Sequence, residues 1–138
     1  MNEIFSDLYS QNYDLFYQDK DYNSECDLIE KLALQGIISP CDILDLGCGT
    51  GGHAKVLADR NHFVLGVDRS ESMINIAARN SSRKLVFLRS DIRELNLMRD
   101  FDIVIIMFSA LGYITNEQDL FQVFQKIREH IKPSGRIF

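Results

Sequence analysis

The spacing of hydrophobic residues changes near Ser39-Pro40. Through the first 35 residues, apolar side chains recur every three to four positions, which indicates amphipathic helices. Ser24 is a suitable N-cap for the second helical stretch, and Gly36 is a suitable stop. Beyond the proline, short apolar runs alternate with amphipathic stretches. We therefore expect a helical N-terminal segment followed by a mixed α/β region.

The mixed region predicts strands and helices in alternation. The strands are expected at 42–47, 63–68, 84–91 and 101–109, and the helices at 51–61, 70–80 and 116–131. Ser70 and Asn116 are suitable caps for the second and third of these helices. Strands that alternate with helices are joined by right-handed crossovers, so the sheet should be parallel and covered on both faces. The expected fold class is a Rossmann-like, doubly wound α/β sheet.

The chain ends soon after the last predicted helix. Residues 132–135 have the composition of a turn, and 136–138 begin one more apolar strand. The sheet is therefore expected to be truncated after about the fifth strand. An unfinished edge can pair with another strand, so a homodimer through this edge is one expected consequence.

Composition restricts the broad class of protein. A chain of 138 residues with 46% apolar and 25% charged residues is typical of one globular domain. No apolar run reaches the roughly 18 residues of a membrane span, and the acidic N-terminus lacks the features of a signal peptide. The 3 cysteines form neither a metal motif nor a disulfide framework. We expect a cytoplasmic protein with no membrane partner.

The charge is uneven along the chain. The formal net charge is −5; residues 1–30 carry −7 and the remainder carries +2. An acidic segment repels phosphate backbones, so no nucleic-acid partner is expected. His53, His62 and His130 are scattered, so no metal site is expected.

A glycine-rich turn follows the first predicted strand, in the stretch "ILDLGCGTGGH" at 43–53. The turn has no Gly-Lys-Ser/Thr and so does not fit a nucleoside triphosphate loop. Gly47, Gly49 and Gly52 do fit the G-x-G-x-x-G pattern of dinucleotide sites, and Asp68 follows at the end of the next strand. The glycines alone leave a nicotinamide or flavin dinucleotide open as the ligand.

Acidic residues close three consecutive predicted strands. Asp45, Asp68 and Asp91 follow one another at intervals of 23 residues. The carboxyl ends of parallel strands form one ligand-binding edge, so these side chains should lie together. Asp45 conflicts with a pyrophosphate and suits a cation, whereas Asp68 suits ribose hydroxyls and Asp91 an exocyclic amine. The ligand that combines a cation, a ribose and an amino-purine is S-adenosylmethionine (SAM).

The same stretches resemble motifs of the class I SAM-dependent methyltransferases. "DLGCGTG" is similar to their first motif, "VDRS" to their ribose motif and "SDIREL" to their adenine motif. The resemblance implies a SAM-binding core over residues 37–138, with the helical segment 1–36 covering the cofactor site. It also implies an enzyme that releases S-adenosylhomocysteine as its product.

The resemblance assigns roles to residues of the glycine turn and of the strand ends. Asp45 would face the methionine ammonium, and the backbone of Gly47, Cys48 and Gly49 would line the amino-acid part. Asp68 would accept hydrogen bonds from both ribose hydroxyls. Cys48 is interpreted as a small loop residue and not as a nucleophile, because no base lies near it in sequence.

Further positions of the family pattern surround the adenine and the sulfur. Arg69 and Met73 would cover the adenine ring. Asp91 and the N–H of Ile92 would read the adenine edge. Met107 and Phe108, at the end of the fourth predicted strand, would pass the sulfonium.

Two stretches narrow the resemblance to a subfamily. "YDLFYQDKDYNSE" at 13–25 and "FDIVIIMFSALGY" at 101–113 are similar to motifs of small-molecule N,N-dimethyltransferases of nucleotide-linked amino sugars. This resemblance implies catalytic roles for Tyr17, near the transferred methyl, and Tyr113, near the acceptor amine. It places Tyr22 at the cofactor. The link between Tyr17 and Tyr22 is shorter here than in that subfamily.

Three hypotheses for function follow. The first is a SAM-dependent methyltransferase that acts on a small-molecule acceptor, an amine in the subfamily interpretation. The alternative is a SAM-binding core that is inactive alone and needs a partner or self-association to complete the fold. The third is a dinucleotide-dependent oxidoreductase, against which Asp45 argues because of its charge.

Overall fold

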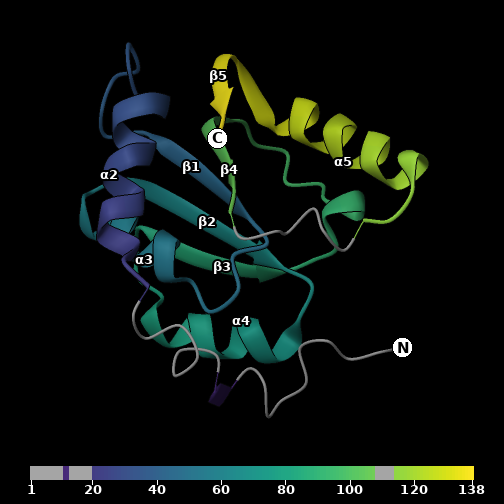
Figure 1. The fold of residues 1–138 in the computed structure, drawn as a ribbon, viewed down its shortest axis with the longest axis horizontal. Helices are drawn as coiled ribbons and strands as arrows, with labels where there is room; N and C mark the ends of the chain where they lie inside the picture. Colours follow the sequence, from purple (N-terminus) through teal and green to yellow (C-terminus); the bar gives the residue numbers. More distant parts are fainter. Residues whose placement is uncertain (1–10, 13–19, 108–113) are drawn as a thin grey trace.

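The fold is a five-stranded parallel sheet with helices on both faces (Figure 1). The structure, a computed structural model, describes residues 11–12, 20–107 and 114–138. The strand order is β3-β2-β1-β4-β5, and every neighbouring pair is parallel. The prediction of a Rossmann-like, doubly wound sheet is therefore confirmed.

The elements follow one another in the expected alternation. In chain order they are α2 (Tyr22–Ala33), β1 (Asp42–Leu46), α3 (Gly52–Asp59), β2 (Phe63–Asp68), α4 (Glu71–Ala77), the 3-10 helix η1 (Ala78–Asn80), β3 (Leu85–Arg89), the 3-10 helix η2 (Ile92–Glu94), β4 (Phe101–Ile106), α5 (Glu117–His130) and β5 (Ile131–Ile137).

Two hydrophobic cores lie on opposite faces of the sheet. The alternation of side chains along β1 sends Ile43 into one core, with α2 and α3, and Leu44 into the other, with α5. Both side chains are fully buried. A strand with an apolar side chain on each face is buried on both sides, and this requires the doubly covered arrangement that Figure 1 shows.

The centre of the sheet is the point where the winding reverses. β1 pairs with β2 on one side and with β4 on the other. Asp45, one residue before the end of β1, lies opposite Gly66 of β2 and Ile105 of β4. Ligands of doubly wound sheets bind outside the carboxyl ends of the strands at such a switch point, so the fold directs Asp45 to the expected ligand edge.

One of the predicted helix caps is wrong. α2 begins at Tyr22, and its N-cap is Asp21, whose carboxylate accepts hydrogen bonds from the backbone N–H of Ser24 (3.0 Å) and from its hydroxyl (2.6 Å). Ser24 is thus the partner of the cap, because a carboxylate three residues earlier reaches the same free N–H groups. The caps predicted at Ser70 and Asn116 are confirmed.

The last strand corrects the predicted chain ending. The predicted turn at 132–135 lies inside β5, which begins at Ile131. The ladder with β4 pairs Phe101 with Ile131 and next Ile103 with Arg136, so the intervening residues form an irregularity of the strand. Such a bulge accommodates Pro and Gly, which a regular ladder disfavours.

The Phe87 ring of β3 occupies space that side chains at Gly51 and Gly66 would need. A Cβ placed on Gly66 would lie 2.6 Å from a ring carbon of Phe87, and a Cβ on Gly51 would lie 2.7 Å from another. Both distances are shorter than atomic contact allows. The ring therefore fits only because the adjacent strand and the glycine turn carry no side chain at these positions.

We predict that Gly66→Ala destabilises the fold by about 1–3 kcal/mol, because the new methyl group overlaps the Phe87 ring. Phe87→Leu should lower the free energy of unfolding of the wild-type protein. In the Gly66→Ala variant the same change should lower it less, or not at all. Urea unfolding of the two single variants and the double variant measures this coupling. Strictly additive changes in the free energy of unfolding would show that the ring does not exclude the side chain.

Candidate functional site

The three predicted acids lie at the carboxyl edge of the sheet. Asp45 is in β1, Asp68 is the last residue of β2, and Asp91 precedes η2 two residues after β3 ends. β1, β2 and β3 are neighbours in the sheet. The structure thus brings the strand ends together in the predicted order, and the three carboxylates differ in their surroundings.

Asp45 is a buried carboxylate without a partner. Its side chain is 1% exposed, and neither carboxylate oxygen has a hydrogen-bond partner in the structure. Burial raises the pKa of Asp45 from 3.8 to about 8, and the charge of Asp68 adds to the shift. Unpartnered buried polar groups are costly, and a strongly raised pKa in such a group is a feature of functional sites. A bound cation would supply the missing interactions.

Asp68 organises the glycine turn. One carboxylate oxygen accepts the N–H of Gly49 (2.9 Å) and the other accepts the N–H of Ser70 (2.9 Å). The side chain is largely buried, and burial raises its pKa above the ordinary value despite these hydrogen bonds. The backbone of Arg69 also hydrogen-bonds to this carboxylate. Since a carboxylate offers about four acceptor directions, Asp68 keeps capacity to accept from a ligand hydroxyl.

Several N–H groups of the glycine turn are used within the protein. The N–H groups of Gly47 and Cys48 both donate to the carbonyl of Val67, and that of Gly51 donates to the carbonyl of Cys48. A phosphate-binding loop instead points its N–H groups at the anion. With these donors occupied and two carboxylates beside the turn, the site disfavours a pyrophosphate and favours a positively charged ligand.

Asp91 is held by a single arginine. Arg93 donates from its guanidinium to both carboxylate oxygens of Asp91, at 3.0 and 2.5 Å, and from its backbone N–H to Oδ1 at 2.9 Å. The hydrogen bond from Arg93 holds the pKa of Asp91 below its ordinary value. Asp91 is therefore ionised near neutral pH, in contrast to Asp45.

Tyr22 closes the glycine turn from the side of α2. A Cβ on Gly52 would lie 2.4 Å from the Tyr22 ring, so Gly52 is required by this aromatic contact. The ring also meets His53 edge-on, with 4.9 Å between ring centroids. The imidazole Nε2 of His53 lies 3.3 Å from Glu25, which also pairs with Lys20 at 2.7 Å. These contacts fix the start of α2 against the turn.

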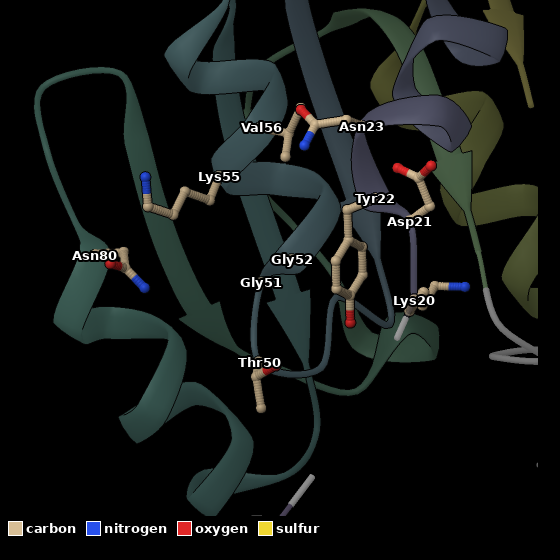
Figure 2. A pocket seen from close by; sticks show the side chains of 10 residues that line it. All are labelled: Lys20, Asp21, Tyr22, Asn23, Thr50, Gly51, Gly52, Lys55, Val56 and Asn80. Carbon is tan, nitrogen blue, oxygen red and sulfur yellow. The ribbon is translucent and has the colours of Figure 1, made fainter. Parts of the chain in front are cut away.

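A cavity of about 330 Å³ lies beside the Tyr22 ring (Figure 2). Figure 2 shows the ring between α2 and the turn, with Lys55 and Asn80 on the opposite wall. Asp45, Asp68 and Asp91 do not line this cavity. The cavity is thus lined by residues other than the three predicted acids.

The remaining predicted residues fall into two groups. Four lie near the carboxyl edge: Arg69 is exposed directly after β2, Met73 is buried in the first turn of α4, Ile92 begins η2, and Met107 follows β4. Tyr17, Phe108 and Tyr113 lie outside the described residues.

Cys48 lies in the glycine turn, where its sulfur packs close to Gly66. Burial raises the pKa of its thiol well above the ordinary value, so the thiol is not activated as a nucleophile. This agrees with its interpretation as a small loop residue.

Sequence reasoning missed Phe87, His53 and Arg93 as residues of the site. Arg93 carries a readable signal, since an acid followed two residues later by an arginine at a strand end can form a local ion pair. Phe87 and His53 carry none, because an apolar residue in a strand and a histidine in a helix are typical of any core.

The described residues offer neither a metal-binding cluster nor a membrane-spanning helix. The part of the chain that the structure describes holds no group of three or more His, Cys, Asp or Glu side chains placed to bind a metal ion. Within residues 11–12, 20–107 and 114–138, no helix has both the length and the apolar character needed to cross a membrane.

Comparison with known proteins identifies the class. The family model described as a methyltransferase domain matches residues 43–135, which include β1 and the three acids. The chain therefore belongs to the methyltransferase domain family. Membership decides against the dinucleotide-dependent oxidoreductase, and no comparison supports the alternative of a core that is inactive alone.

Amino-sugar N,N-dimethyltransferases are among the proteins that this chain is similar to. The chain is 32% identical over 133 residues to the dTDP-3-amino-3,6-dideoxy-alpha-D-glucopyranose N,N-dimethyltransferase of Streptomyces fradiae, covering 95% of this chain and 52% of that protein. It is 30% identical to the crystal structure of Streptomyces venezuelae DesVI, with a TM-score of 0.83, covering 94% of this chain and 55% of that one. The chain thus spans about half the length of the relatives it matches.

The raised pKa of Asp45 predicts a pH-dependent stability. Below about pH 8, folded Asp45 keeps a proton that the unfolded chain releases above its ordinary pKa of 3.8, so stability falls as the pH rises between these values. Asp45→Asn lacks this effect. The difference in free energy of unfolding between Asp45→Asn and the wild type should therefore shift in favour of the variant by about 1.4 kcal/mol for each pH unit across that window.

Urea unfolding at pH 5, 6, 7 and 8 measures the difference. Asp59→Asn is the matched control, because Asp59 is an exposed carboxylate paired with Lys55. Parallel stability profiles of wild type and Asp45→Asn would contradict the assignment.

Proposed function

We propose that this chain is the cofactor-binding part of a SAM-dependent methyltransferase that acts on the amine of a small molecule, a nucleotide-linked amino sugar. The observation that carries the proposal is the unpartnered buried carboxylate of Asp45, beside Asp68, at the switch point of the sheet. This arrangement suits a ligand that carries a cation next to a ribose. The family of the chain gives the reaction class.

Each acidic residue of the site would bind a different part of the cofactor. Asp45 would hold the methionine ammonium, directly or through water, and would lose its proton when the cation binds. Asp68 would accept from the ribose hydroxyls with its remaining acceptor capacity. Asp91 would accept from the adenine amine. When bound, SAM supplies a methyl group on a sulfonium, which an in-line displacement transfers to the acceptor.

The chain's contribution to the reaction is alignment and exclusion of water, because the sulfonium already activates the methyl carbon. The Tyr22 ring is fixed against the glycine turn by Gly52 and His53. Tyr17 would face the transferred methyl, since aromatic rings attract a sulfonium. An amine attacks only when neutral, and Tyr113 would accept its proton.

The names of the relatives support an amine acceptor. Two relatives at 32% identity are N,N-dimethyltransferases of dTDP-linked amino sugars, from Streptomyces fradiae and Streptomyces venezuelae. An N,N-dimethyltransferase places two methyl groups on one nitrogen, so its pocket must accept a secondary amine as well as a primary one. We extend this acceptor class to the present chain.

The assigned contacts predict separable losses of binding. Asp45→Asn should weaken S-adenosylhomocysteine by roughly tenfold or more at pH 8.5, as expected for a lost hydrogen bond to a charged group. It should leave 5′-methylthioadenosine unchanged, because this nucleoside lacks the amino-acid part. Asp68→Asn should weaken both ligands. Calorimetry measures the four affinities, with Asp59→Asn as control.

Two results would contradict the cofactor assignment. One is a wild-type chain that binds NAD and not S-adenosylhomocysteine. The other is an Asp45→Asn variant that binds both adenosyl ligands as tightly as the wild type does.

The acceptor class predicts the product. Incubation with SAM and dTDP-3-amino-3,6-dideoxyglucose should give mono- and then dimethylated amine, whereas the N-acetylated sugar should not react. Tyr113→Phe should lower turnover on the order of a hundredfold, as for a lost general base, while binding of S-adenosylhomocysteine is unchanged. Mass spectrometry follows the products. Methylation of a phenol in preference to the amine would overturn the acceptor class.

A further inference from the structure

Arg93 joins the assigned residue Asp91 to Asp119 in a charged cluster. Its side chain is 35% exposed, and it makes a bidentate ion pair with Asp91. Its remaining terminal nitrogen donates to Asp119 of α5 at 3.0 Å. Bidentate arginine–carboxylate pairs fix the relative orientation of both groups. The cluster therefore determines the orientation of the Asp91 carboxylate.

The hydrogen bonds leave the two oxygens of Asp91 unequal. Oδ1 accepts both the backbone N–H and Nε of Arg93, whereas Oδ2 accepts Nη2 and no second hydrogen bond from the described residues. Each carboxylate oxygen offers two acceptor directions. Within these contacts Oδ1 is saturated and Oδ2 keeps one direction open.

The arginine is itself anchored to α5. Asp119 also accepts a hydrogen bond from the side chain of Asn116, the N-cap of α5, at 3.0 Å. The side chain of Gln122 donates to the carbonyl of Arg93 at 3.4 Å. Arg93, in the middle of η2, is thus tied to the first two turns of α5, and its side chain cannot rotate without breaking the contacts to Asp91 and Asp119.

We propose that Arg93 is a positioning residue for cofactor recognition, which fixes Asp91 so that one open acceptor direction, on Oδ2, selects a 6-amino purine over a 6-oxo purine. The proposal rests on the proposed function, in which Asp91 meets the adenine edge. An adenine amine would donate to the open direction. A 6-oxo purine would instead bring a carbonyl oxygen against the carboxylate, and two acceptors repel.

The role of Arg93 is one of orientation. The pKa of Asp91 lies below its ordinary value, so the carboxylate is an acceptor throughout the neutral range. Without the arginine the carboxylate would stay ionised but could rotate, and it would no longer present one fixed acceptor direction to the purine.

The test compares S-adenosylhomocysteine with its deaminated analogue, S-inosylhomocysteine, by calorimetry. The wild type should prefer the amino form by roughly tenfold or more, as expected for a hydrogen bond to a charged group. Arg93→Ala should reduce this preference at least several-fold, mainly through weaker binding of the amino form. Arg93→Lys keeps the positive charge but cannot make the bidentate pair with Asp91, so it should also lose selectivity for the amino form. Arg128→Ala, an exposed change on α5, is the matched control.

Asp119→Asn isolates the anchor. It leaves the Asp91–Arg93 pair in place and should give a selectivity between those of the wild type and Arg93→Ala. Thermal unfolding checks each variant, and Arg93→Lys carries the test if Arg93→Ala does not fold.

The outcomes separate the two proposals. A wild type that prefers the amino form, with unchanged selectivity in folded Arg93 variants, overturns the role of Arg93 and leaves the proposed function intact. Equal weakening of both ligands by Arg93→Ala also overturns it, because that result indicates general destabilisation of the site. A wild type that binds neither ligand overturns the proposed function and this inference with it.

Discussion

The site depends on one unfavourable feature, a carboxylate buried without a partner at the centre of a parallel sheet. Asp45 replaces an apolar side chain in a strand that is otherwise buried on both faces. An isolated charge is costly in such a place, and burial raises the pKa of Asp45 to about 8, which favours the protonated form near neutral pH. In the proposed function a bound cation would stabilise the ionised form, and this coupling would favour a positively charged ligand.

The glycine turn provides space around the site, whereas the charges that would bind the ligand come from the aspartates. Gly47, Gly49 and Gly51 have positive φ angles, and Gly51 and Gly52 also leave space for the rings of Phe87 and Tyr22. The turn directs its N–H groups inward, to backbone carbonyls and to Asp68. A pattern shared with dinucleotide-binding loops therefore serves a site of opposite charge, and the carboxylates make the difference.

The sequence predicts the fold and the acids well, because both follow from periodicity. Parallel strands end at one edge, so an acid at each strand end must lie there. The cap at Asp21 was missed because two good capping residues stand three positions apart, and only the backbone path decides between them. The path of β5 depends on a bulge opposite Phe101, which is a tertiary effect. The pairing of Arg93 with Asp91 is local and readable, but its pairing with Asp119 joins segments 26 residues apart, and no local pattern predicts it.

A carboxyl NMR titration of Asp45 tests directly whether this buried carboxyl group is protonated in the free protein and ionised when the cofactor binds. With ¹³C-labelled aspartate, and with Asp45→Asn to identify the resonance, the pKa of Asp45 is measured in the free protein and with S-adenosylhomocysteine bound. We expect a pKa of about 8 in the free protein and a clearly lower pKa in the complex, because the ligand's ammonium would stabilise the ionised form. An ordinary pKa near 3.8 in the free protein, or a value that the ligand leaves unchanged, would contradict it.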